Sequence, residues 1–279
     1  KNIERILLMF YIKRGDFMSD LAMLIFGFGF IFAMTTLGSS IVYFLKKDIS
    51  TKANTIILGF ASGIMIAASI WSLLIPALED VEDYGKLYWL PAAVGFLLGG
   101  GFLVLMDKLV PHFHKGTNLE EGPQSSLKKS TKLFLAVLIH NIPEGLAVGF
   151  AFGAAANIGT HAAYIAALGL AIGLGIQNFP EGAAVALPMR AATNSSHKAF
   201  LYGMGTGVVE PIFAIVGYFL ATQIHALQPW LLAFSAGAMI FVVVEDLIPD
   251  CHLDHHPHLG TWALMIGFVL MMVLDVALG

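Results

Sequence analysis

Eight apolar stretches, each about as long as a bilayer is thick, dominate this sequence. A helix needs about 20 apolar residues to cross the hydrocarbon core. Of the 279 residues, 57% are hydrophobic and 12% are charged, and that charge is about half of what a soluble domain carries. The sequence therefore predicts an all-α membrane protein with eight transmembrane helices. We expect them at residues 21–45, 55–77, 88–110, 131–154, 162–187, 199–222, 229–249 and 260–278.

The polar breaks between these spans are too short to hold a second core, apart from the loop at about 111–130, which is strongly polar. Residues 21–279 are therefore expected to form a single transmembrane domain. Residues 1–20 are set apart as an N-terminal extension, because Met18 opens a second plausible start. No function is assigned to that extension.

The basic residues beyond the extension predict the orientation of the spans, because lysine and arginine favour cytoplasmic loops. The loops between spans two and three, four and five, and six and seven hold only Lys86. We therefore expect the alternate loops in the cytoplasm and both termini outside. Those alternate loops and their flanks hold Lys46, Lys47, Lys52, Lys108, Lys115, Lys128, Lys129, Lys132, Arg190 and Lys198.

The remaining composition excludes some partners and cross-links. The net charge is −4 and no long basic run is present, so nothing indicates a nucleic-acid partner. A single cysteine, Cys251, excludes an intramolecular disulfide.

"IHNIPEG", residues 139–145, places polar groups in the middle of span four. His140 and Glu144 are four residues apart, so they share one helix face, and Asn141 lies on the flank of that face. Pro143 removes a backbone donor, and kinks of this kind open helices beside polar sites. Span four is therefore expected to carry a polar site inside the membrane.

"IQNFPEG", residues 176–182, repeats this pattern in span five, 37 residues later. Gln177, Asn178 and Glu181 take the corresponding positions. A single His–Glu pair could serve as a hydrogen bond between packed helices. Two copies with the same Asn-x-Pro-Glu-Gly core favour a shared functional site.

Three more carboxylates lie within spans six and seven. Glu210 precedes a proline in span six, and Glu245 and Asp246 are adjacent in span seven. An ionised carboxylate in hydrocarbon is costly, so such groups normally face a partner or a water-filled path. Imidazole with several carboxylates suits a borderline divalent ion such as zinc, and a dication relieves the repulsion among them. The sequence therefore predicts an intramembrane site for a divalent metal.

Spans two and seven also resemble each other. "GFASGIMIAASIWSLLIP", residues 59–76, is echoed by "AFSAGAMIFVVVEDLIP", residues 233–249. We therefore expect spans 1–3 and 6–8 to form an inverted repeat around spans 4–5. That organisation is typical of secondary transporters, whose sites lie near the membrane midplane.

At these residues the sequence resembles the ZIP (Zrt/Irt-like protein) family of divalent metal transporters, in its bacterial branch. The spans, the polar loop after span three, "HNIPEG", "QNFPEG" and the ending "MMVLDVALG" carry the resemblance, from about residue 20 onward. It implies import of a divalent metal into the cytoplasm by elevator-type alternating access. It also implies a homodimer in the bilayer of a bacterial cytoplasmic (inner) membrane. The expected substrate is Zn²⁺, with Cd²⁺, Fe²⁺, Mn²⁺ and Co²⁺ as alternatives.

The resemblance implies a binuclear metal centre between spans four and five, with the two motif glutamates bridging the ions. Asn178 replaces an aspartate of some bacterial relatives, and Gln177 replaces a histidine of many eukaryotic ones, so the second position has less charge. The first position would be formed by His140, Glu144, Gln177 and Glu181. The second would be formed by Asn141, Asn178, Glu144, Glu181 and Glu210.

Residues outside the two motifs are expected along the transport path. Met65 in span two matches a family position whose thioether faces the site. Asp275 belongs to the matching family ending and is a candidate for the outer mouth, as is Glu79. The remaining path candidates are Glu245 and Asp246. Candidates for transient metal binding in the cytoplasmic loops, which could equally be ordinary solvated loops, are His112, His114, His252, His255, His256 and His258.

Two other functions were weighed against transport. An intramembrane metalloenzyme would want His-Glu-x-x-His or, in di-iron bundles, Glu-x-x-His, and neither pattern occurs at the buried motifs. We therefore expect no enzyme. A metal sensor without flux would need neither an outer entrance nor an inner exit, yet both ends carry candidate ligands.

Overall fold

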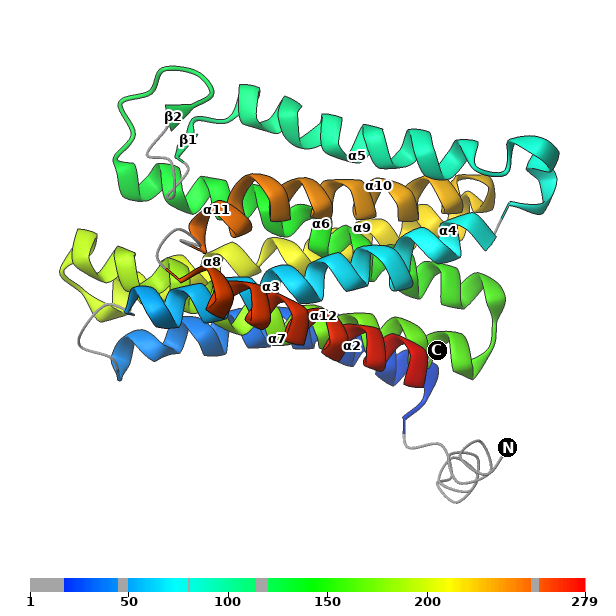
Figure 1. Ribbon diagram of the computed structural model, residues 1–279, viewed down its shortest axis with the longest axis horizontal. Coiled ribbons are helices and arrows are strands. Elements are labelled where there is room, and N and C mark those ends of the chain that lie inside the picture. Colours follow the sequence, from blue (N-terminus) through cyan, green and yellow to red (C-terminus); the bar gives the residue numbers. More distant parts are fainter. Residues whose placement is uncertain (1–17, 45–49, 80, 114–119, 252–255, 279) are drawn as a thin grey trace.

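The computed structural model describes residues 18–44, 50–79, 81–113, 120–251 and 256–278. Eight helical spans in these residues are long and apolar enough to cross a membrane, so the expected number is confirmed. The start of α2 and the end of α12 lie at the same end of the bundle, opposite β1 and β2 (Figure 1). Residues 1–17 of the extension expected at 1–20, and the loop candidates His114, His252 and His255, lie outside the described residues.

Several spans consist of more than one helical segment. The two short strands pair in antiparallel fashion, with His112 opposite Glu121. The elements are α2 (Asp20–Ser40), η1 (Ile41–Tyr43), α3 (Thr51–Ala68), η2 (Ser69–Leu74), α4 (Ile75–Glu79), η3 (Glu82–Leu87), α5 (Leu90–Leu109), β1 (His112–Phe113), β2 (Glu120–Glu121), α6 (Lys129–Ile158), α7 (His161–Thr193), α8 (Ser196–Gly207), α9 (Val209–Gln223), η4 (His225–Leu227), α10 (Gln228–Val242), η5 (Val243–Leu247), α11 (Ile248–Asp250) and α12 (Pro257–Leu278).

Short polar residues set where several spans begin. The side chains of Ser19, Ser50, Thr160 and Ser195 each accept a hydrogen bond from a backbone N–H three residues further on. Such caps satisfy backbone donors that a helix leaves unpaired at its start. Gly159 has a φ of 71°, in the left-handed region that glycine adopts at low cost, and it ends α6.

Close packing sorts the spans into two groups of four. Spans one, four, five and six (α2, α6, α7 and α8–α9) pack together, and we call them the motif group. Spans two, three, seven and eight (α3, α5, α10 and α12) pack together, and we call them the flanking group. The two groups meet where α10 contacts α6 and where α3 and α12 contact α7.

The flanking group contains two helix pairs that are packed alike. A Cβ atom added to Gly63 of α3 would overlap the carbonyl oxygen of Leu264 in α12. A Cβ atom added to Gly237 of α10 would overlap the carbonyl oxygen of Phe96 in α5. Glycine allows this backbone contact, which is a common way of joining helices in membranes. The contact of span two with span eight thus has a counterpart between spans seven and three.

Spans two and seven also share a π-helical segment, η2 in the first and η5 in the second. Each follows the glycine of its tight helix pair. Short π-helical segments inside α-helices occur frequently at functional sites. The hydropathy pattern did not predict these segments.

The boundary between the groups is made by side chains. Gly173 of α7 faces the side chain of Met271 in α12. Asn157 Nδ2 of α6 donates to Gln228 Oε1 of α10 at 2.8 Å. A flexible thioether against a glycine allows more adjustment than a backbone contact does.

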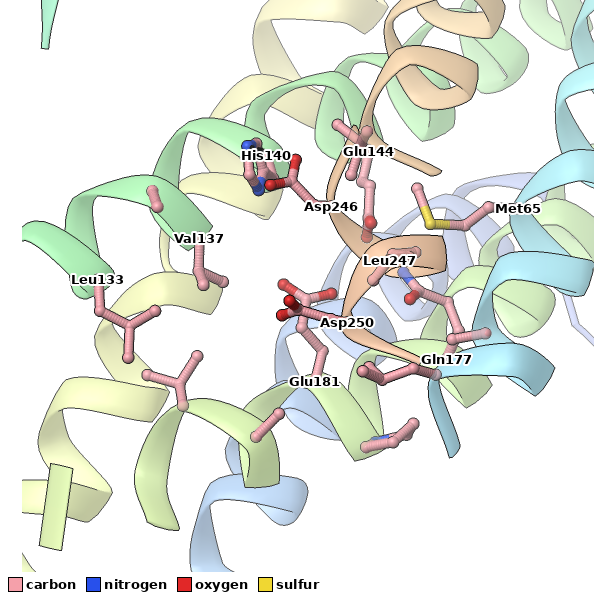
Figure 2. A pocket seen from close by; sticks show the side chains of 17 residues that line it. Met65, Leu133, Val137, His140, Glu144, Gln177, Glu181, Asp246, Leu247 and Asp250 are labelled. Carbon is pink, nitrogen blue, oxygen red and sulfur yellow. Dashed lines mark ion pairs between the residues drawn. The ribbon is translucent and has the colours of Figure 1, made fainter. Parts of the chain in front are cut away.

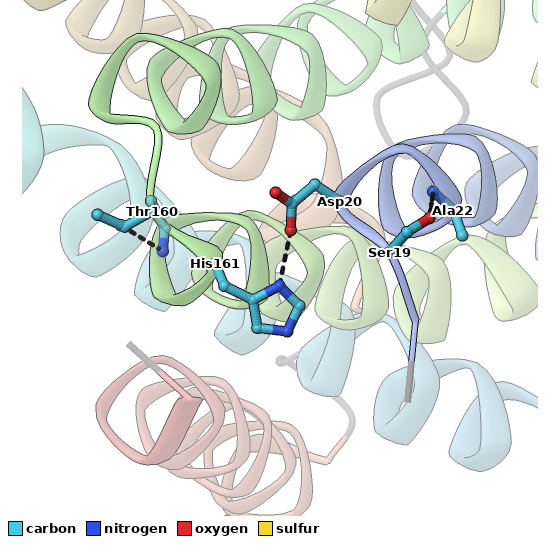
Figure 3. Close-up of polar contacts among 6 residues, drawn as sticks. Ser19, Asp20, Ala22, Thr160 and His161 are labelled. Carbon is cyan, nitrogen blue, oxygen red and sulfur yellow. Dashed lines mark hydrogen bonds and ion pairs between the residues drawn. The ribbon is translucent and has the colours of Figure 1, made fainter. Parts of the chain in front are cut away.

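Inside the motif group, a polar contact joins the start of α2 to the start of α7. His161 Nδ1 lies 2.6 Å from Asp20 Oδ1, and both residues stand in the first turns of their helices (Figure 3). Ser19 caps α2 by accepting from the Ala22 N–H beside this contact. These contacts hold the ends of two spans whose middles carry the polar site.

Candidate metal site

The polar residues of the two motif copies meet beside a cavity in the middle of the bundle. The cavity has a volume of about 90 Å³. Four of its lining residues, His140, Glu144, Gln177 and Glu181, are those expected at the first metal position. Met65 of α3 also lines it, so a thioether from the flanking group faces the motif residues (Figure 2).

The cavity continues toward the end of the bundle that carries β1 and β2. Its walls there are Leu133 and Val137 of α6, with Leu247 and Asp250 of span seven. That end is the one the basic residues predict to be cytoplasmic. The cavity therefore extends from the motif side chains toward this end, with a mostly apolar lining and the carboxylate of Asp250 at its far wall.

His140 and Asp246 form a contact across the boundary of the two groups. His140 Nε2 lies 3.2 Å from Asp246 Oδ2, and the two side chains are 14% and 16% exposed (Figure 2). Glu245, the neighbouring carboxylate, lines a different cavity between α5 and α10. The structure thus brings Asp246 to the site and directs Glu245 away from it.

Glu210 and the two motif asparagines form a second, fully buried cluster. Glu210 Oε1 accepts hydrogen bonds from Thr35 Oγ1 at 2.8 Å and from Asn141 Nδ2 at 3.0 Å. Glu210 Oε2 accepts from Asn178 Nδ2 at 2.6 Å. The structure therefore joins the three residues expected only at the second position. Thr35 was missed, because a threonine in an apolar helix usually bonds its own backbone and gives no signal.

A break in span six places Glu210 in this cluster. α8 ends at Gly207 and α9 begins at Val209, so Glu210 stands in the first turn of α9. Unpaired N–H groups and the helix dipole favour a carboxylate there. The backbone also comes close, because a Cβ atom added to Gly145 would overlap the carbonyl oxygen of Glu210. The span expected at 199–222 is confirmed as one membrane-spanning segment, Ser196–Gln223. Its interruption at the single residue Val208 was not predicted.

Two buried oxygens of the site have no hydrogen-bond donor among the described residues, namely Glu144 Oε2 and Asn141 Oδ1. Buried acceptors without a donor are rare in native proteins, and a bound cation is one partner that would satisfy them. No three His, Cys, Asp or Glu side chains in the described part of the chain are grouped closely enough to hold an ion. Binding at this site would therefore also use amide or thioether ligands, or draw the side chains together.

Glu79 and Asp275, the expected outer-path residues, share a second cavity at the opposite end of the bundle. This cavity has a volume of about 300 Å³. Ser72 Oγ donates to Asp275 Oδ1 on its wall. Six alanines of α6 and α7 form another part of its wall, so both groups line it.

The described loop histidines differ from one another. His112 is fully buried, its Nδ1 donates to the Val110 carbonyl at 2.8 Å, and its Nε2 lies 3.3 Å from Asp107 Oδ1. These contacts favour an anchoring role over the solvated metal-binding role expected for it. His256 precedes α12 and His258 lies in its first turn, where the ring is exposed.

Cys251 follows the last residue of span seven, beyond the cavity mouth. Burial raises the pKa of its thiol to about 11, with a smaller opposing effect from a hydrogen bond to Ser62. The thiol is therefore protonated at neutral pH, and it is the thiolate that binds soft metals.

Eight helical spans enclose carboxylates and amides, and a partly exposed imidazole, beside a cavity, an arrangement typical of membrane proteins that bind or transport cations. The chain matches the family model described as ZIP Zinc transporter over residues 124–275. The chain belongs to the ZIP family, which is a family of transporters and not of enzymes, and the resemblance noted in the sequence is confirmed.

Named relatives occur in bacteria and in vertebrates. The chain is 41% identical to zinc transporter GufA of Myxococcus xanthus, over 84% of this chain and 91% of that protein. It is 37% identical to zinc transporter ZIPB of Bordetella bronchiseptica, over 89% and 79%. It is 35% identical to human zinc transporter ZIP11, over 90% and 95%.

Proposed function

We propose that this protein imports a divalent metal, with zinc as the preferred substrate, into the cytoplasm. His140, Glu144, Gln177 and Glu181 would bind the transported ion. The names of the relatives as zinc transporters support the substrate. Mixed nitrogen and oxygen ligation suits zinc and also admits cadmium, iron, manganese and cobalt.

The observation that carries the proposal is the cavity that joins the motif residues to one end of the bundle. It contains all four ligands proposed for the first position and ends at Asp250. A cavity that extends from the site toward the end expected to be cytoplasmic, with a separate cavity at the other end, fits one half of an alternating-access cycle.

The two helix groups support an elevator-type movement. Close backbone contacts lie within the flanking group, while side chains make the described boundary contacts with the motif group. Sliding of the motif group would exchange the contacts His140–Asp246 and Asn157–Gln228. Bistable interfaces of this kind allow packed bundles to switch.

The remaining parts of the proposal concern arrangement. The matching helix pairs and π-helical segments of spans two and seven support an inverted repeat of spans 1–3 and 6–8. The count of basic residues supports an orientation with both termini outside. The location in a bacterial cytoplasmic (inner) membrane is proposed from the family resemblance. A homodimer and a centre with two adjacent sets of ligand residues are proposed from the family resemblance, and a single domain over 21–279 from the short polar breaks between the spans.

Zinc uptake by reconstituted vesicles tests the proposal. Purified protein in liposomes that enclose a zinc-sensitive dye should give a time-dependent signal after external zinc is added. Protein-free liposomes and the Glu144→Ala variant are the controls, and both should stay at the leak rate. Saturable zinc binding by wild-type protein without any uptake would overturn the proposal in favour of a sensor.

A further inference from the structure

At the second metal position the carboxylate of Glu210 is fully hydrogen-bonded, while Asn141 Oδ1 beside it has no donor among the described residues. Both oxygens of Glu210 are engaged, by the hydroxyl of Thr35 and the amides of Asn141 and Asn178, at 2.6 to 3.0 Å. Glu210 is fully buried. Its three donors come from α2, α6 and α7, so the carboxylate is enclosed by the motif group.

The direction of these hydrogen bonds matters for metal binding. A carboxylate only accepts, so both asparagines turn their N–H₂ groups toward Glu210, and an amide nitrogen offers no lone pair to a metal. The other end of the Asn178 amide is also engaged, because its Oδ1 accepts from Gln177 Nε2 at 2.6 Å. Asn178 therefore has no free ligand atom facing the second position.

We propose that the second position holds no metal ion in this protein and that the side-chain amide of Asn178 takes the place of the ion. The centre then carries one ion at a time, at the position of His140, Glu144, Gln177 and Glu181. The inference refines the proposed function and rests on it for the identity of the cargo.

The balance of buried charge supports a single ion. One dication with Glu144 and Glu181 is neutral, and Glu210 is compensated separately by three donors and the start of α9. Two dications would meet these three carboxylates with a surplus positive charge. An unpaired buried charge is strongly unfavourable. An aspartate at position 178 would remove that surplus.

The network also gives Glu210 a role without contact to the ion. Glu210 holds Asn178, and Asn178 holds the amide of Gln177, which lines the cavity. Glu210 is thus a positioning residue for a ligand of the first site.

Metal counting on purified protein tests the inference. Wild type, Asn178→Asp, Glu210→Gln and the double variant are equilibrated with zinc, desalted, and analysed for zinc per chain by mass spectrometry. Only differences between variants are compared, because ions bound to the loop histidines contribute equally to all four. Thermal unfolding in detergent confirms that each variant is folded.

We expect Glu210→Gln to bind as many ions as wild type and Asn178→Asp to bind about one more. The double variant should return to the wild-type count, because the added ion needs both carboxylates. Loss of one ion in Glu210→Gln alone would overturn the inference. So would an unchanged count in folded Asn178→Asp.

Electron paramagnetic resonance with Mn²⁺ gives a second readout, because it distinguishes an isolated ion from a spin-coupled pair. Wild type should show isolated ions, and Asn178→Asp should show a spin-coupled pair. A coupled pair in wild type would overturn the inference. Absence of zinc uptake by wild-type vesicles would instead refute the proposed function, whatever the ion count.

Discussion

The two copies of the Asn-x-Pro-Glu-Gly motif share a sequence but have different surroundings. In α6, the His140 side chain is 14% exposed and contacts Asp246 across the group boundary. In α7, Gln177 is 1% exposed and bonds Asn178 within its own helix. The first residue of one copy therefore contacts the flanking group, while that of the other bonds within its own helix, although both line the same cavity.

What the copies share is a backbone arrangement. The glycine after each glutamate allows a neighbouring helix to approach, so that a Cβ atom added to Gly145 would overlap the Glu210 carbonyl and one added to Gly182 would overlap that of Thr35. Both neighbours also belong to the Glu210 network. The comparison teaches that the repeat duplicates a packing device, while the polar partners decide the role of each copy.

The largest effect is expected for the two glutamates, where the copies should behave alike. Glu144→Ala and Glu181→Ala should each reduce vesicle zinc uptake to the leak rate, because each removes a negatively charged ligand of the proposed metal position. Uptake at equal protein density is the measurement. Near-normal uptake in either variant would contradict the site assignment.

His140 and Gln177 occupy corresponding positions in the two motifs, and their replacement should affect zinc uptake differently. His140→Ala should abolish uptake, since it removes a ligand and the contact with Asp246 together. Gln177→Ala should retain a measurable fraction, because a neutral amide is a weaker ligand and its loss leaves both glutamates. Initial rates over a range of zinc concentrations compare the two, and equal losses would refute the distinction.

The close backbone approach at the two motif glycines should contribute to the stability of the protein. Gly145→Val and Gly182→Val should each lower the free energy of unfolding by roughly 1–3 kcal/mol, as overpacking does. The matched control is Gly29→Val in α2, where an added Cβ atom meets nothing within 4 Å. Thermal unfolding in detergent compares them. A control as destabilised as the two motif variants would show that valine in a helix, rather than close approach, is responsible.

The smallest effect is expected at the described loop histidines. Replacing His256 and His258 by serine should change the uptake rate by at most about twofold, the size of effect typical of surface substitutions. The same vesicle assay measures it. Complete loss of uptake in a folded double variant would place these residues in the transport site itself.

Much of this architecture could be predicted from the sequence, because apolar length determines membrane spans and the spacing of His140 and Glu144 determines a shared helix face. The meeting of the two motifs was predicted from their repetition. The break before Glu210 and the π-helical segments were not, since hydropathy is blind to helix continuity. The contact of Thr35 and the burial of His112 depend on which helices become neighbours, and a single sequence does not contain that information.

The order of helix pairing has a consequence for how the protein is made. α3 packs through Gly63 against α12, which begins at Pro257. This helix pair can therefore form only after α12 has been synthesised. At about 5–20 residues per second, synthesis of the intervening chain takes roughly 10–40 s. During that time the glycine surface of α3 faces lipid or insertion machinery. Removal of α12 would leave this surface without its partner.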